Sequence, residues 1–263
     1  MRQRATFCLL LSVAIVVGGG SAAAHYTYIM PDAFRVTAGD AVVVGFHSGD
    51  GFPESSTILK RLQAPTMTTE GMSAALEGVQ EDGKRLVATV RVPSASHIIL
   101  TAVNASAVEQ MKGPSFEKYL AEEGLDDVIK ARAVRGESEA TGRERYTMYA
   151  KAILSTGAPG NGFGVVAGLP IEIVPEKDPY HLRAGESLPV RVLLKGRLAA
   201  GLRLMASAEG AQPQVIGITD SQGRLDVSVS RGKWRLHTIA MERVGEDAID
   251  WESFWATLTF EVP

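Results

Sequence analysis

Residues 188–194 read LPVRVLL, and this stretch shows the pattern that decides the fold. Val190, Val192 and Leu194 fall on every second position, so they share one face of an extended chain. Three further runs alternate in the same way: AVVVGF at 41–46, RLDVSV at 224–229 and TLTFEV at 257–262. Because glycine-rich turns separate such runs, the sequence predicts a mostly β fold made of antiparallel sandwiches.

Residues 112–155 interrupt this pattern and predict helices. Ser115 can cap a short helix that Gly124 ends, and Asp126 or Asp127 can start a second helix. We interpret the block as a helical insertion packed on the first sandwich.

A third helix is predicted at the end of this block. Residues 141–144, TGRE, match a capping box in which Thr141 is the N-cap and Glu144 reaches back to it. The apolar residues behind the box recur at helical spacing, which predicts one buried stripe. They are Tyr146, Tyr149, Ala150 and Ile153.

The proline and charge content of residues 175–180, PEKDPY, is typical of a linker. We therefore expect two immunoglobulin-like sandwich domains, at 25–175 and 176–263. The helical insertion belongs to the first domain.

The first 24 residues predict a secretory signal peptide. A basic start, MRQR, precedes an apolar stretch at 5–17 and the small residues SAAA at 21–24. The apolar stretch is short, because a membrane-spanning helix needs roughly 20 residues. We expect cleavage between Ala24 and His25, which would place the mature protein in the periplasm. Cleavage after Ala23 and a retained membrane anchor are the alternatives.

Composition restricts the partners of the mature chain. Its side chains would carry 25 basic and 30 acidic groups, and no basic stripe with interleaved aromatic residues is present, which argues against nucleic acid. The one cysteine, Cys8, lies in the apolar stretch, so the mature chain has no thiolate for a metal or for catalysis. No mature segment has the length and apolarity of a transmembrane span.

A mature chain that begins at His25 can chelate a metal through its α-amino nitrogen and its imidazole. Cu²⁺ or Ni²⁺ can displace the proton of the amine near neutral pH. Copper stands above nickel and zinc in the general affinity order. The sequence therefore predicts a transition-metal site for nickel, cobalt or copper at His25, unless the histidine is an accident of cleavage.

Such a site needs further ligands. If residues 25–30 and 41–47 form antiparallel strands, residue 25 lies opposite the segment that contains His47, Asp50 and Glu54. An ordinary polar turn is the alternative for the two acids.

The remaining histidines are weaker candidates. His97 begins a strand and can simply cap its end, and His181 is expected to be an exposed linker residue. His237 shares a strand face with Lys233 and Arg235, which predicts a solvent-facing side chain that can still serve a site between the domains. We include His97 and His237 among the candidate metal ligands.

Enzyme motifs are absent from the sequence. It contains no Gly-x-Ser-x-Gly elbow, no His-Glu-x-x-His pair and no dinucleotide fingerprint. We therefore do not expect an enzyme.

Several stretches together resemble the bacterial DUF4198 family, which was formerly described as a subunit of a nickel transport complex. They are AHYTYIMPDAFRVTAGD, GDGFPE, FEKYLAEEGLDDVIKARAVRGESEATGRERYTMYAKAIL, DPYHLRAGESLPVRVLLKGRLAAG, TDSQGR and DWESFWATLTFE. The resemblance implies a periplasmic protein linked to nickel or cobalt uptake, with a histidine directly after the signal peptide. It also implies that the second domain is similar to the carboxypeptidase-regulatory-like sandwich.

One position departs from the family pattern. Where the resemblance implies a histidine, before MER at 241–243, this chain has Ala240, and His237 lies three residues earlier.

We expect a metal-binding accessory protein that delivers nickel, cobalt or copper to an envelope transporter. A metal-independent carbohydrate- or protein-binding sandwich is the alternative. A copper mono-oxygenase, which also begins with histidine, is a third reading.

Overall fold

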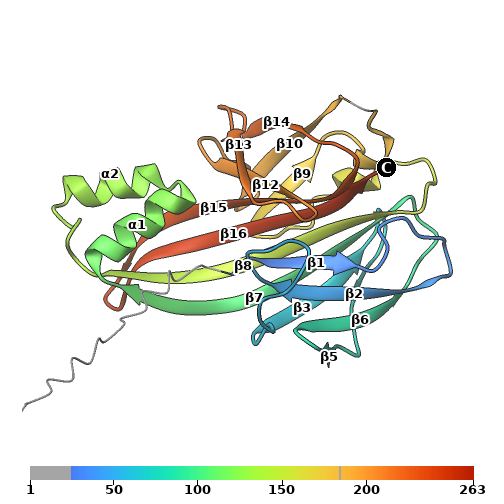
Figure 1. Cartoon of the computed structure of the whole chain (residues 1–263), viewed down its shortest axis with the longest axis horizontal. Helices are drawn as coiled ribbons and strands as arrows, with labels where there is room; N and C mark the ends of the chain where they lie inside the picture. The colour runs from blue at the N-terminus through green and yellow to red at the C-terminus, as the bar shows by residue number, and fades with distance from the viewer. Residues whose placement is uncertain (1–24, 184) are drawn as a thin grey trace, which may run out of the picture.

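The computed structural model describes residues 25–183 and 185–263, and β-strands make up most of its regular structure (Figure 1). One sheet has eight strands, and two smaller sheets have four strands each. This architecture confirms the predicted mostly β fold of sandwich type. The predicted signal peptide at 1–24 lies outside the described residues.

The large sheet has long strands at its centre and short strands at its edges. In spatial order its strands are β13 (Gln214–Ile218), β12 (Arg203–Ala208), β15 (Gly232–Glu246), β16 (Ile249–Val262), β8 (Gly142–Ser155), β7 (His97–Met111), β3 (Leu62–Thr68) and β4 (Ser73–Ala75). The first small sheet consists of β1 (Thr27–Pro31), β2 (Ala41–Ser48), β6 (Arg85–Arg91) and β5 (Gln80–Asp82). The second consists of β11 (Arg197–Leu198), β10 (Ser187–Leu194), β14 (Arg224–Ser228) and β9 (Ile171–Pro175), which pairs with β10.

The two small sheets cover opposite faces of the large sheet (Figure 1). On one face, the hydroxyl of Thr257 in β16 donates to the carbonyl of Thr27 in β1 at 2.7 Å. On the other face, Lys151 of β8 lies 2.9 Å from Glu172 of β9. Thr257 is in register with Ala150, and neighbouring residues of a strand point to opposite faces. The long strands β8 and β16 are therefore covered on both faces where the two small sheets pack, whereas the ends of β7 and β15 near the helices are more exposed.

Parallel pairing of β16 with β8 joins early and late parts of the chain. The register runs from Trp251 opposite Glu144 to Thr259 opposite Ala152. Strands from before and after residue 176 thus share one sheet, and one cluster of buried apolar residues extends through both parts. The division into two domains at this residue stays a prediction.

Alternation in β10 follows the sequence pattern. Leu188, Val190 and Val192 are fully buried, whereas Pro189 and Arg191 are partly exposed. This confirms the strand predicted at 188–194. Burial of one apolar face against the large sheet is what selects the extended conformation here.

The helix predicted behind the TGRE box is wrong, because residues 142–155 form β8. This strand pairs with β7 on one side and β16 on the other. A strand buried on both faces has no polar side, so its apolar residues can match helical spacing by coincidence. Glu144 does not cap a helix and instead accepts hydrogen bonds from Tyr119 and Ser253. The helical insertion is therefore limited to the two helices before β8.

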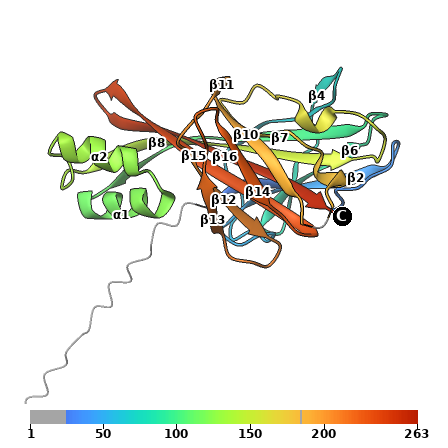
Figure 2. The same cartoon turned by 90° about the horizontal axis from the view of Figure 1, so that it is seen from above.

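These two helices lie where the sequence predicts them, but the predicted cap at Ser115 is wrong, because the first helix begins at Gly113 with Lys112 as its N-cap. They are α1 (Gly113–Glu123) and α2 (Asp126–Val134), and they form a hairpin at one end of the long strands (Figures 1 and 2). Gly124 ends α1 with a φ of 76°, a left-handed conformation that glycine adopts without strain. Among the described residues, no helix is long and apolar enough to cross a membrane. Short 3₁₀ turns occur at Gly162–Gly164 and Pro179–His181.

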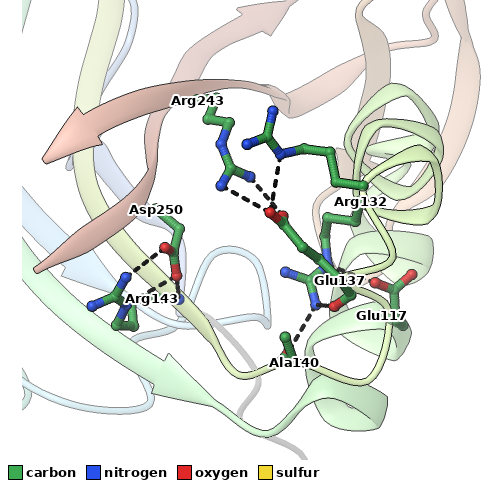
Figure 3. Close-up of polar contacts among 8 residues, drawn as sticks. Glu117, Arg132, Glu137, Ala140, Arg143, Arg243 and Asp250 are labelled. Carbon is green, nitrogen blue, oxygen red and sulfur yellow. Dashed lines mark hydrogen bonds and ion pairs between the residues drawn. The ribbon is translucent and has the colours of Figure 1, made fainter. Parts of the chain in front are cut away.

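Charged side chains fasten the helical hairpin to the sheet (Figure 3). Arg132 is 1% exposed, lies 2.6 Å from a carboxylate oxygen of Glu117 and donates to the carbonyl of Glu137. The Glu137 carboxylate in turn accepts two hydrogen bonds from Arg243 of β15, at 2.7 and 3.0 Å. The hairpin is thus held in a fixed position above the end of the pocket described below.

We expect Lys151→Met to lower the free energy of unfolding by about 3–5 kcal/mol, because it leaves the Glu172 carboxylate buried without its cation. The double variant Lys151→Met/Glu172→Leu should recover most of this loss. Urea unfolding of the two variants measures both effects. Lys118→Met is the control, since Lys118 forms an exposed pair with Glu122 and should leave stability nearly unchanged. Equal stability of wild type and Lys151→Met would contradict the prediction.

Candidate functional site

The start of β1 brings the first described residue against the loop after β2. Tyr28 lies opposite His47 in the antiparallel register, and the backbone N–H of Gly49 donates to the carbonyl of Tyr26 at 3.0 Å. One step further, His25 Nδ1 lies 3.3 Å from Asp50 Oδ2. The predicted antiparallel pairing of these strands is confirmed, and it places His25 beside Asp50.

The His25–Asp50 pair is close but is not aligned as a hydrogen bond. His25 Nδ1 is shielded from solvent and has no hydrogen-bond partner among the described residues. Both side chains are otherwise accessible, at 41% and 44% exposure. An imidazole nitrogen and a carboxylate oxygen therefore face the same small space, and neither is saturated by protein donors.

A pocket of about 320 Å³ opens beside His25. Its floor is formed by alternate residues of β8, Glu144, Tyr146 and Met148, and by Trp255 of the adjacent strand. Glu144 and Met148 are four positions apart on the strand, or about 13 Å, so the pocket is elongated along β8. His25 lies at one part of its wall and Glu144 at another.

Two carboxyl groups near this pocket have unusual acidity. Glu144 is 2% exposed and accepts a hydrogen bond from the Tyr119 hydroxyl at 3.0 Å; burial raises its pKa to about 7. Burial also raises the pKa of Glu123 to about 7, although the Tyr26 hydroxyl donates to it at 3.1 Å. Both groups therefore exchange protons near neutral pH.

Arg235 holds the loop that carries Asp50. Its guanidinium is fully buried and lies 5.0 Å from the ring centres of Tyr26 and Tyr28, and 5.6 Å from that of Phe52. It donates to the Asp50 carbonyl at 2.9 Å. In the described part of the chain, no carboxylate lies within 4.0 Å of it, so aromatic faces and carbonyl oxygens stabilise its charge.

His237 is buried next to this arginine. It is 1% exposed, and its ring centre lies 4.1 Å from that of Tyr26. Burial, with a smaller contribution from Arg235, lowers its pKa to about 3. The solvent-facing orientation predicted from the sequence is wrong, because β15 is an inner strand and Tyr26 covers this face of it.

His47 lies on the other side of the β1–β2 pair. Its ring stacks on Tyr28 with a centre-to-centre distance of 5.2 Å, and its Nδ1 lies 2.8 Å from the Ser55 hydroxyl. Burial lowers its pKa to about 4. His47 and His25 line two different pockets, so the structure does not bring the two imidazoles together.

His97 lies at the far end of β7. It is fully buried, and its Nε2 lies 3.2 Å from Asp178 Oδ2. His181 lies 2.6 Å from the same carboxylate and has a side chain that is 65% exposed, which confirms its predicted exposure. His97 and Asn104 are seven residues apart on β7, or about 23 Å, and Asn104 lines the pocket beside His25.

The predicted metal ligands therefore occupy separate places. His25 and Asp50 come together, His237 lies behind Tyr26, and His47 and His97 lie elsewhere. Within residues 25–183 and 185–263, no group of three or more His, Cys, Asp or Glu side chains is arranged to hold a metal ion. Their role as metal ligands stays a prediction.

Sequence reasoning did not identify the pocket residues Glu144, Tyr119 and Trp255. The TGRE pattern predicts a helix cap at Glu144, and no motif marks Tyr119 or Trp255. One available signal was the polar strand face formed by Lys233, Arg235 and His237, which alternate with Trp234 and Leu236.

Glu144 should make stability depend on pH in a defined direction. Its folded pKa, about 7, lies above the ordinary value of 4.5, so its contribution to stability is complete below about pH 4.5 and is lost as the pH rises through 7. Between pH 4.5 and pH 8, we expect the free energy of unfolding of Glu144→Gln to rise by about 3 kcal/mol relative to that of wild type, because only wild type loses this contribution. Urea unfolding at both pH values measures this difference, with exposed Glu122→Gln as the control. A difference that does not change with pH would refute it.

Arg235→Lys should lower the free energy of unfolding by about 2 kcal/mol, because an ammonium group cannot stack its plane on three rings and reach both loop carbonyls. Chemical denaturation measures the loss. Arg231→Lys, the same change at an exposed position, is the matched control. Identical denaturation curves for Arg235→Lys and wild type would show that the aromatic cage contributes nothing.

No curated protein matches the sequence. Among solved structures, the three N-terminal domains of the highly immunogenic outer capsid protein of bacteriophage RB49 match at 10% identity with a TM-score of 0.20. This match covers 90% of the present chain and 59% of the phage chain, and it carries no argument about function.

A family model gives a clear result. The model described as "Domain of unknown function (DUF4198)" matches residues 22–242, which include His25, Asp50 and the β8 residues of the pocket floor but not Trp255. Because this match spans most of the sequence, the chain belongs to the DUF4198 family.

Proposed function

We propose that the protein is exported to the periplasm, is cleaved before His25 and serves there as a metal-binding accessory protein. Its cargo is nickel, cobalt or copper, which it passes to an envelope transporter. The proposed site consists of His25 and Asp50, and its working step is pick-up and release without catalysis.

The observation that carries the proposal is the 3.3 Å separation of His25 Nδ1 and Asp50 Oδ2. Around an ion with bonds of about 2.0–2.1 Å, two neighbouring donor atoms lie roughly 2.9–3.4 Å apart. The two atoms are therefore spaced as ligands of one ion. Cleavage before His25 adds the α-amino nitrogen, which forms a chelate ring with Nδ1.

The orphaned Nδ1 atom supports this fit. A buried nitrogen without a hydrogen-bond partner is costly unless something occupies it. A metal ion would occupy it and would neutralise the nearby Asp50 carboxylate. Three protein donors leave other coordination positions open, as a carrier that must release its cargo requires.

Arg235 supports the site from behind. Its hydrogen bonds to the carbonyls of Gly49 and Asp50 fix the loop, so Asp50 is held opposite His25 before any metal arrives. The absence of cysteine from the chain after residue 24 suits an exported protein that binds metal through nitrogen and oxygen.

The mature chain starting at His25 should bind Ni²⁺, Co²⁺ or Cu²⁺, and Asp50→Asn should weaken binding about tenfold or more. His25→Ala should remove the chelate and weaken binding further. A chain with one glycine added before His25 should lose affinity as well, since it keeps the imidazole but moves the α-amino group. Isothermal titration with each metal, with the N-terminal mass recorded, measures these effects.

His181→Ala is the control, because His181 is exposed but lies beside Asp178 rather than near His25. If all these variants bind metal as wild type does, the site is wrong. If the wild type binds none of the three metals, the metal-independent binding module becomes the better account.

A further inference from the structure

The pocket beside His25 is much larger than a metal ion requires. At about 320 Å³ it has room for about ten water molecules, and its size falls in the range of small-molecule sites. Its floor extends about 13 Å from Met148 to Glu144, whereas a metal-ligand bond is about 2 Å. The space therefore fits an organic molecule that lies beside His25, the one member of the proposed metal site that lines the pocket.

Two cations on the pocket wall have no carboxylate partner. Lys60 and Arg61 come from the segment before β3, and no acidic side chain of the described residues lies within 4.0 Å of either. Arg61 uses two of its nitrogens to donate to the Ala105 carbonyl and the Tyr146 hydroxyl. Its remaining N–H groups and the Lys60 ammonium can receive a carboxylate from a ligand.

The pocket also contains an acceptor without a donor. Asn104 is 7% exposed, and its Nδ2 donates to the Thr27 hydroxyl at 3.2 Å, but its Oδ1 is buried and has no hydrogen-bond partner. A buried acceptor oxygen is normally paired with an N–H or O–H donor, which a ligand in the pocket can supply. Asn104 lies opposite Met148 in the strand register, close to the His25 end of the pocket.

Apolar side chains also line the pocket. Trp255 and Met148 are buried and present ring and thioether surface, and Tyr146 adds a second ring. This surface suits the carbon skeleton of a small molecule. The three features together describe a ligand with a carboxylate, a short carbon chain and an amino or hydroxyl donor.

We propose that this pocket binds a small carboxylate chelator with an amino or hydroxyl group, so that the metal reaches His25 as a chelate rather than as a bare ion. The inference rests on the proposed function. In the ternary complex, the chelator fills coordination positions that His25 and Asp50 leave open, while Lys60 and Arg61 hold its free carboxylate.

The test uses the mature chain with Ni²⁺ alone, with Ni²⁺ and citrate, and with Ni²⁺ and histidine. Equilibrium dialysis with radiolabelled citrate or histidine measures the chelator retained, and nickel analysis measures the metal retained. We expect one chelator molecule to be retained per bound nickel ion. With citrate or histidine present, the protein should retain nickel at least tenfold more tightly than it does against nitrilotriacetate on resin, a competing chelator that the protein does not bind.

Lys60→Ala and Lys60→Ala/Arg61→Ala should reduce chelator retention about tenfold while leaving the affinity for Ni²⁺ alone unchanged. Lys60 is exposed, so its single variant carries little risk of misfolding. Lys118→Ala/Lys130→Ala removes the same charge from the helices and should change neither quantity.

The outcomes separate this inference from the proposed function. If nickel binds through His25 but citrate and histidine only strip it away, the chelate inference is overturned and the carrier function stands. If a chelator is retained without nickel and regardless of His25→Ala, the pocket is a metal-independent ligand site and the chelate inference is overturned. If neither nickel nor chelator is retained, both proposals fail.

Discussion

Parallel hydrogen bonding between β16 and β8 is the contact on which the candidate site depends. It sets Trp255 beside Met148 and Trp251 beside Glu144, so the pocket floor is made by residues more than 100 positions apart. β1 packs on one face of this strand pair, and β9 packs on the opposite face. Without this pairing, the N-terminal strand would have no surface on which to place His25.

Two buried cations fix the structure around the pocket floor. Arg235 is surrounded by three rings and hydrogen-bonded to loop carbonyls, and Lys151 is paired with Glu172 on the opposite face. Lys151 is fully paired, and Arg235 donates through its two terminal nitrogens while its buried Nε has no hydrogen-bond partner among the described residues, so fixed contacts offset only part of the cost of desolvation. The practical result is a rigid loop at Asp50, which matters for a site with few ligands.

The acidity of the pocket follows from the same packing. Glu144 lies under α1, where the hydroxyl of Tyr119 reaches it, and burial keeps its carboxyl neutral up to about pH 7. A neutral carboxyl at this position would not compete with Asp50 for a cation and would not repel a ligand carboxylate. Above that pH the negative charge of Glu144 would repel an anionic ligand, so the affinity of the pocket for such a ligand would fall as the pH rises.

The sequence by itself determined the strands with one polar face, the C-terminal end of α1 at Gly124, and the position of His25 opposite the segment that contains Asp50. These features depend on local periodicity, glycine conformation and hairpin geometry, which a single stretch of chain contains. It did not reveal β8 as a strand or His237 as buried, because both lie in inner strands covered on a face by distant segments. The pocket itself was decided only by tertiary structure, since β7, β8, β16 and α1 create it jointly and none of them carries a motif for it.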